Sequence, residues 1–182
     1  MKFFPLLFIS TLLLAAPSGI YVEANFENPQ SDGISVEDSE YVYDKGLAGT
    51  VAVGYQMDQW RFEVESNYSQ NALKSFDDTI SNIAHGDIVQ AGGLVNVYYS
   101  AYNNTKLVST IGLGVGATEV QALSDIDDSK VKTDPSLTYQ GSVSLGYMLD
   151  EDWTWTIKYR YLDIKDTENE NQAFSFGIRY LF

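Results

Sequence analysis

Apolar and polar residues alternate one by one along most of the chain, and this period of two predicts strands rather than helices. In the segment 60–68, for example, Trp60, Phe62 and Val64 share one face, whereas Arg61 and Glu63 share the other. Eight segments repeat the pattern, and they are 20–27, 47–56, 60–68, 89–99, 107–116, 139–147, 153–161 and 174–182. Each is roughly ten residues long, which is the length that a tilted strand needs to cross a bilayer.

The connections between these segments are short and long in turn. The tight turns are 57–59, 102–105 and 149–152, and the longer, polar connections are 29–45, 70–86, 118–134 and 163–171. Short turns at one end and long loops at the other are typical of outer-membrane barrels. An even number of strands also returns both ends of the chain to the short-turn, periplasmic side. The pattern therefore predicts an all-β protein, an eight-stranded antiparallel up-and-down transmembrane β-barrel.

A soluble barrel of lipocalin type is the main alternative, because it would alternate equally well. Its polar face would meet water and carry many Lys and Glu residues. Here that face is mostly Ser, Thr, Gly, Gln and Asn, which fit inside a narrow barrel. Aromatic residues also gather near the short turns, as in the girdle at a membrane interface. The predicted girdle comprises Tyr55, Trp60, Tyr147, Trp153 and Phe182. Both features favour the membrane barrel.

The beginning of the chain has the pattern of an export signal. Lys2 precedes the apolar stretch 3–16, which is too short for the roughly 20 residues that a membrane-spanning helix needs. Cleavage after Ser18 or after Ala24 would fit the small-residue rule. The second site would remove residues whose alternation predicts a strand, so we place cleavage after Ser18. The expected organisation is a signal peptide, 1–18, followed by the barrel, 19–182.

Composition narrows the function further. The 182-residue chain is long enough for one domain and has no cysteine, which excludes disulfides and Cys-based metal or redox centres. Its formal net charge of −14 argues against a nucleic-acid partner, because such a partner requires a basic face. The 13 tyrosines and nine phenylalanines are typical of a β-protein.

The few charges within the strands lie on the polar side and have complementary signs. Acidic residues of segment 60–68 stand nearly opposite basic residues of segment 153–161, and the first and last segments carry one opposite charge each. Charges in so narrow an interior are tolerated when they are paired. We therefore predict a salt-bridge network that plugs the lumen, and the alternative is a wet channel lined by the same charges. The network comprises Glu23, Glu63, Glu65, Lys158, Arg160 and Arg179.

Candidates for catalysis are few. His85 is the single histidine, and it lies in a long loop near Asp78, Ser81 and Asp87. Such residues can perform acyl transfer, but one loop gives them no fixed geometry. A solvated loop histidine is the favoured interpretation, and no enzymatic activity is expected.

Two further motifs have structural interpretations. The acidic runs 37–40 and 125–128 offer oxygen ligands to calcium or magnesium, but they lack the glycine of an ordered ligand loop. Gly112, Gly114 and Gly116 imitate a nucleotide-binding run, yet they lie within a strand and no helix follows. Solvated acidic loops and a small-residue lumen explain these motifs, so neither a metal nor a cofactor is expected.

Several motifs resemble one family. They are 60–68 (WRFEVESNY), 96–99 (NVYY), 111–116 (IGLGVG), 139–141 (YQG) with 159–161 (YRY), and 176–182 (FGIRYLF). The chain resembles the rickettsial major surface antigens, which belong with the opacity-type, outer membrane protein A-like barrels. The resemblance implies a surface antigen of a host-associated Gram-negative bacterium, sometimes with adhesive or porin activity. The final motif is similar to the signal read by the barrel assembly machinery, with Ile178, Tyr180 and Phe182 as its residues.

The expected function follows from these observations. The chain is predicted to be an integral protein of the bacterial outer membrane that acts as a surface antigen or host-contact protein. A small porin or a structural barrel is the alternative. Its expected partners are membrane lipid, the assembly machinery and a host surface protein, which would contact the loops 29–45, 70–86, 118–134 and 163–171. Their acidity would repel anionic partners and leaves basic proteins or bridging cations as contacts. A closed barrel has no free edge, so a monomer is expected.

Overall fold

The structure is a computed structural model, and it consists of strands joined by turns. It describes residues 18–30, 34–36, 39–41, 46–72, 86–103, 105–124, 130–132, 134–165 and 170–182. The strands are β1 (Gly19–Gln30), β2 (Ile34–Val36), β3 (Ser39–Tyr41), β4 (Leu47–Met57), β5 (Trp60–Ala72), β6 (Gly86–Tyr102), β7 (Leu107–Ser124), β8 (Lys130–Lys132), β9 (Ser136–Met148), β10 (Trp153–Ile164) and β11 (Glu170–Leu181). No described residue lies in a helix long and apolar enough to cross a membrane.

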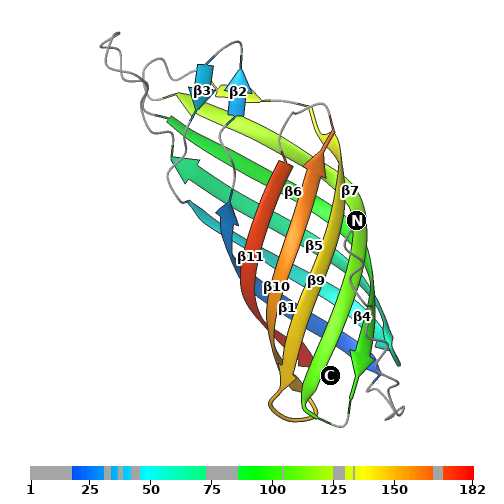
Figure 1. The fold of residues 1–182 in the computed structure, drawn as a ribbon. Helices are drawn as coiled ribbons and strands as arrows, with labels where there is room; N and C mark the ends of the chain where they lie inside the picture. Colours follow the sequence, from blue (N-terminus) through cyan, green and yellow to red (C-terminus); the bar gives the residue numbers. More distant parts are fainter. Residues whose placement is uncertain are drawn as a thin grey trace, which may run out of the picture.

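Eight of these strands close into a barrel. Hydrogen bonds join them in the order β6-β5-β4-β1-β11-β10-β9-β7, and β6 also pairs with β7, which completes the ring. All of these pairings are antiparallel. Figure 1 shows the tilted strands wrapping around one axis, with β2 and β3 beyond the end opposite the short turns. The structure thus confirms the predicted eight-stranded antiparallel barrel.

Burial follows the alternation in the sequence. In β10, Thr154, Thr156 and Lys158 are buried, whereas Trp155 and Ile157 are exposed. Successive side chains of a strand point to opposite faces, so every barrel strand divides its residues between the interior and the outer surface. The interior is polar and the outer surface is apolar, which is the reverse of a soluble protein. This outer surface requires lipid around it.

The short turns are fixed by local hydrogen bonds. Asp58 follows β4 with a φ of 54°, a left-handed conformation that Asp tolerates better than most residues. In the β9–β10 turn, Asp150 Oδ1 accepts hydrogen bonds from the backbone N–H of Asp152 at 3.0 Å and of Trp153 at 2.7 Å. Lys106 Nζ reaches this turn from the β6–β7 turn and donates to the carbonyl oxygen of Leu149 at 2.9 Å.

The strands are longer than the alternation predicts. β6 has 17 residues and β7 has 18, so parts of the segments 70–86 and 118–134, predicted as loops, continue the barrel wall. The ends of the predicted loops 29–45 and 163–171 likewise belong to β1, β10 and β11. β8 lies within segment 118–134 and pairs with the end of β7. Outside the bilayer both faces of a strand meet water, so no hydrophobic alternation marks these extensions.

Candidate functional site

Eight of the charged residues that the structure describes lie buried inside the barrel. Alternate positions of one strand share a face, and charges project into the lumen from β1, β5, β10 and β11. The four carboxylates are Glu23, Glu27, Glu63 and Glu65, and the four cations are Arg61, Lys158, Arg160 and Arg179. Among the described buried residues the two signs therefore cancel. An interior with balanced charges avoids most of the cost of burying them singly.

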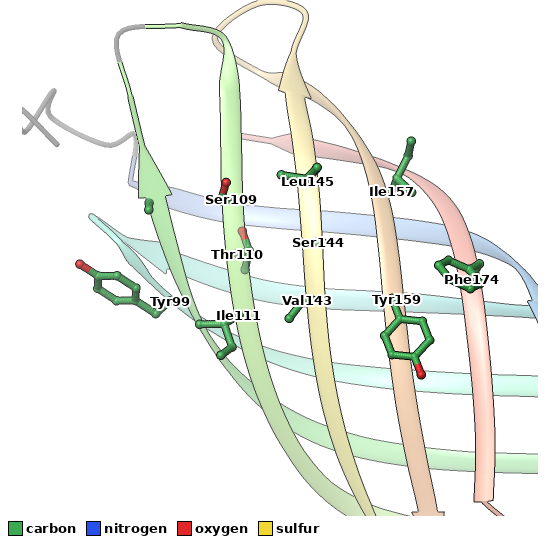
Figure 2. A pocket seen from close by; sticks show the side chains of 11 residues that line it. Tyr99, Ser109, Thr110, Ile111, Val143, Ser144, Leu145, Ile157, Tyr159 and Phe174 are labelled. Atoms are coloured by element: carbon green, nitrogen blue, oxygen red, sulfur yellow. The ribbon is translucent and has the colours of Figure 1, made fainter. Parts of the chain in front are cut away.

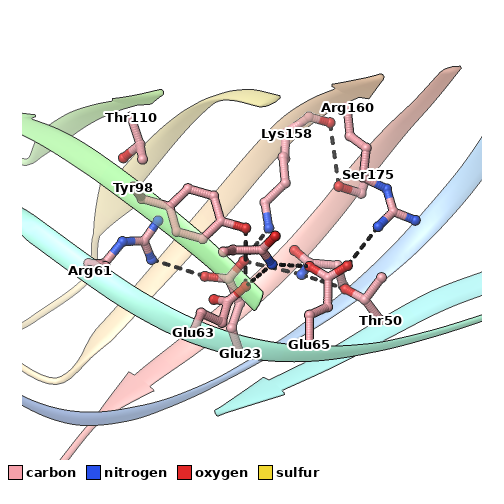
Figure 3. A network of polar contacts seen from close by, with 12 residues as sticks. Glu23, Thr50, Arg61, Glu63, Glu65, Tyr98, Thr110, Lys158, Arg160 and Ser175 are labelled. Atoms are coloured by element: carbon pink, nitrogen blue, oxygen red, sulfur yellow. Dashed lines mark hydrogen bonds and ion pairs between the residues drawn. The ribbon is translucent and has the colours of Figure 1, made fainter. Parts of the chain in front are cut away.

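Arg160 joins opposite walls of the barrel. Its Nη2 lies 2.6 Å from Glu27 Oε2, and its Nη1 lies 2.7 Å from Glu65 Oε1. Nη1 also donates to Gln140 Oε1 at 3.0 Å. Because β10 and β5 stand four strands apart in either direction around the ring, the Arg160–Glu65 pair spans the lumen. Figure 3 shows the side chains of Arg160 and Glu65 reaching toward each other from their strands.

A second group of contacts is centred on Glu23. Its Oε1 lies 2.8 Å from Lys158 Nζ, and its Oε2 lies 3.3 Å from Arg61 Nη1. Asn25 Nδ2 donates to Glu23 Oε1 at 3.1 Å. This carboxylate thus connects β1 with β10 on one side and with β5 on the other, so the ion pairs around Glu23 and Arg160 form two neighbouring bridges across the interior.

Glu63 is held by neutral donors. Its carboxylate accepts hydrogen bonds from the hydroxyls of Tyr21 at 2.9 Å and Tyr98 at 3.1 Å, and from Asn96 Nδ2 at 3.1 Å. The Arg61 guanidinium lies over the rings of both tyrosines, 4.7 Å from the Tyr98 centroid and 5.4 Å from that of Tyr21. The tyrosines therefore contact an anion through their hydroxyls and a cation through their ring faces.

Arg179 has a different environment from the one predicted for it. Register places it beside Glu23 on the neighbouring strand, but the carboxylate of Glu23 contacts Lys158 and Arg61 instead. Arg179 donates to Thr154 Oγ1 at 3.3 Å and lies 5.7 Å from the centroid of the Tyr21 ring. It makes no ion pair with any residue that the structure describes.

The glycines of the lumen provide space for this network. A Cβ atom added at Gly112 would overlap the ring of Tyr98, and one added at Gly114 would overlap Asn96. A Cβ at Gly54 would likewise overlap Tyr21. The glycine run of β7 therefore leaves room for the donors to Glu63, which agrees with the small-residue interpretation of the IGLGVG motif.

A small apolar cluster lies inside the barrel beside the network. Leu94, Leu162 and Ile164 are almost fully buried and pack together from β6 and β10. Leu162 and Ile164 follow Arg160 at alternate positions of β10, whereas Leu94 is paired with Glu65 across β6 and β5. The interior is thus filled mainly by polar side chains, with a few apolar side chains packed among them.

Aromatic side chains surround the short-turn end on the outside. The predicted girdle residues Tyr55, Trp60, Tyr147, Trp153 and Phe182 are all exposed there. Two tyrosines outside the predicted set extend the band through ring contacts. The centroids of Trp60 and Tyr99 are 5.1 Å apart, and those of Trp153 and Tyr180 are 4.6 Å apart.

Comparison with known proteins agrees with this arrangement. The model of the outer membrane protein beta-barrel domain matches residues 4–182. The chain belongs to this family. It is an outer-membrane β-barrel protein, and its location is the bacterial outer membrane. No curated protein matches its sequence.

Solved structures of outer-membrane barrels share its fold. Neisserial surface protein A is 16% identical over 91% of this chain and 98% of its own, with a TM-score of 0.67. OprG from Pseudomonas aeruginosa is 16% identical over 92% and 98%, with a TM-score of 0.59. Ail, the attachment invasion locus protein of Yersinia pestis, in complex with the heparin analogue sucrose octasulfate, is 14% identical over 91% and 97%, with a TM-score of 0.54. At these identities the likeness establishes the fold alone.

Several predicted features fall outside the interior network. Residues 1–17 of the expected signal peptide, Ser81 and His85 lie outside the described residues. Ile178 and Tyr180 lie on the outward side of β11, and Phe182 directly follows this strand. Their role as an assembly signal stays a prediction. The predicted network also omits Arg61 and Glu27. Both residues stand on the polar side of their strands, and this position in the alternation could have identified them as members of the network.

Proposed function

We propose that this outer-membrane β-barrel is non-conducting and non-enzymatic, and that it acts through its extracellular loops as a surface antigen or host-contact protein of the rickettsial or opacity type. The observation that carries the proposal is the contact of Arg160 with Glu65 across the lumen, 2.7 Å between Nη1 and Oε1. A lumen filled by paired side chains leaves the loops as the part of the protein that meets a partner.

The charge of the loops supports a partner with a basic surface. Segment 29–45 contains five acidic residues, Asp32, Glu37, Asp38, Glu40 and Asp44. Ail binds a sulfated, strongly anionic heparin analogue in its structure. The acidic loops of this chain would repel such a ligand and attract cationic proteins. The proposed contact is therefore with a basic protein surface on the host cell.

Electrical recording tests the closed lumen. Protein refolded in detergent is identified by its heat-modifiable gel mobility and then inserted into planar bilayers. We expect the folded band to insert without a steady current. A reproducible conductance step in most insertions would contradict the plug.

Adhesion tests the role of the loops. Bacteria that display the wild-type protein should bind cultured epithelial cells better than bacteria with the empty vector, and the variant E37Q/D38N/E40Q should lose most of the gain. Soluble polylysine should compete by covering the acidic loops and heparin by covering the basic partner, whereas uncharged dextran should not compete. Ser66→Ala, a change on the lipid-facing side, serves as the matched control. Equal adhesion of the empty vector and the wild type would refute the host-contact role.

A small porin is the second candidate, because some polar atoms of the lumen lack a partner. Asn25 Oδ1, Thr156 Oγ1 and the Nε atoms of Arg61 and Arg160 make no hydrogen bond with the described residues. Buried polar atoms of this kind often bind water. A continuous water-filled pore through the lumen would conduct ions, and the bilayer recording separates the two functions.

A further inference from the structure

The outer surface carries a groove across β6, β7, β9 and β10. Its volume is about 530 Å³, and its floor contains the small side chains of Ala101 and Ser109, which are paired across β6 and β7. Tyr99 and Ile111 form the row beside this floor. Figure 2 shows Ser109 and Leu145 nearer the hairpin turns than Ile111 and Val143. The groove therefore begins close to the end that carries the short turns.

Hydrogen bonds hold the aromatic walls of the groove in place. The Tyr99 hydroxyl donates to Gln59 Oε1 at 2.9 Å, and the Tyr159 hydroxyl donates to Gln172 Oε1 at 2.9 Å. The Tyr159 ring also packs against Phe174, with 5.0 Å between the centroids. A groove with fixed walls and a floor of small residues is formed before any ligand binds, which lowers the entropic cost of binding.

The turns beside the groove carry charges of both signs. Lys106 donates to the carbonyl of Leu149, so its ammonium lies at the turn that carries Asp150, Glu151 and Asp152. The short-turn end of an outer-membrane barrel is periplasmic, and these turns therefore meet the headgroups of the inner leaflet. A cation next to several anions matches a headgroup that itself carries a phosphate and an ammonium.

We propose that this groove binds one zwitterionic phospholipid of the inner leaflet. An acyl chain lies over Ala101 and Ser109, the phosphate contacts Lys106, and the ammonium faces Asp150 and its acidic neighbours. An anionic lipid satisfies Lys106 but is repelled by the carboxylates of the 149–152 turn. A free fatty acid meets the same repulsion. This site is independent of the proposed function, since it uses the outer surface and neither the lumen nor the loops.

Lipid titration followed by native mass spectrometry tests the site. Delipidated, refolded barrel is titrated separately with phosphatidylethanolamine and phosphatidylglycerol of identical acyl chains. We expect a first saturable lipid, with phosphatidylethanolamine binding several-fold more tightly. Ser109→Leu, which fills the groove floor, should weaken this binding several-fold. Ser66→Leu makes the same change on the exposed, lipid-facing side of β5 and should leave the binding unchanged. Lys106→Gln should weaken the binding of both lipids, because both carry the phosphate, whereas E151Q/D152N should reduce the preference between them.

Each variant is first checked for heat-modifiable mobility, so that lost binding is not confused with lost folding. Equal binding by wild type and Ser109→Leu would overturn the proposed groove. Equal affinity of the wild type for the two lipids would overturn the zwitterionic assignment. A loss in Ser66→Leu as large as that in Ser109→Leu would show a general effect of the lipid-facing surface, and it would also refute the site.

Discussion

Replacing Arg160 with methionine tests whether the cross-lumen bridge stabilises the barrel. Methionine keeps much of the length of the side chain and removes the guanidinium. Glu27 and Glu65 then lose partners at 2.6 and 2.7 Å, and Gln140 loses a donor at 3.0 Å. Removing one partner of a buried ion pair typically costs about 3–5 kcal/mol, because the other charge stays buried without compensation. We expect Arg160→Met to lower the free energy of unfolding by about this amount.

Arg179→Met is the matched control. Both arginines are buried in the lumen, but Arg179 donates only to the hydroxyl of Thr154, at 3.3 Å, among the described residues. A hydrogen bond from a charged donor contributes about 1.5–3 kcal/mol at most, and this long one should contribute near the lower end. The loss in Arg179→Met should therefore be clearly smaller than that in Arg160→Met. Adding Glu65→Gln to Arg160→Met should recover part of the lost stability, since one unpaired carboxylate is removed.

The measurement is urea unfolding of the barrel in lipid vesicles, followed by tryptophan fluorescence and by the fraction of heat-modifiable protein on gels. Both probes should report one transition, and the slope against urea should be equal in all variants. A loss in Arg160→Met no greater than that in Arg179→Met would refute the reasoning. So would a double variant, Arg160→Met with Glu65→Gln, that is less stable than Arg160→Met alone.

Two other predictions concern space in the lumen and the end of the chain. Gly112→Ala should lower the unfolding free energy by about 1–3 kcal/mol through its overlap with Tyr98, whereas Gly141→Ala, whose Cβ would meet no atom within 4 Å, should be almost neutral in the same urea assay. Phe182→Ala should cost about 0.5–1.5 kcal/mol in vitro by removing the ring contact with Tyr180, whose centroid is 4.8 Å away. If Phe182 belongs to the assembly signal, cells that express the same variant should contain far less folded barrel than this loss of stability explains. Equal amounts of folded variant and wild type in outer-membrane fractions would contradict that role.

The sequence predicted the architecture because the bilayer imposes a strict pattern on each strand. Trp60, Phe62 and Val64 face lipid while Arg61 and Glu63 face the lumen, and only a strand satisfies both environments. Where the strands leave the membrane this constraint ends, so the alternation does not mark the upper parts of β6 and β7. The predicted boundaries are wrong there for this reason.

The partners of the lumen charges were harder to predict than their positions. Contacts in the interior join residues far apart in the chain: Arg160 and Glu27 are separated by 133 positions, and Arg160 and Glu65 by 95. Which charges stand at the same height depends on the stagger of the strands around the barrel, and a single sequence does not specify that stagger. Pairing of Glu23 with Lys158 and Arg61, rather than with its strand neighbour Arg179, is a consequence of this geometry.

The distribution of charge connects the closed lumen with the proposed surface role. Described buried residues contribute four carboxylates and four cations, which cancel, so the net charge of −14 belongs to the rest of the chain. The lipid-facing side is apolar, and this excess therefore lies mainly at the two ends of the barrel and in its loops. A strong electrostatic field of one sign at a surface speeds encounter with partners of the opposite sign. Salt screens this field, and at 0.1 M little of it remains beyond about 10 Å from the charges. Adhesion through these loops should accordingly weaken as salt is raised, whereas the buried bridges of Arg160 should keep the barrel folded under the same conditions. Adhesion independent of salt would point to an apolar contact and would contradict a basic partner.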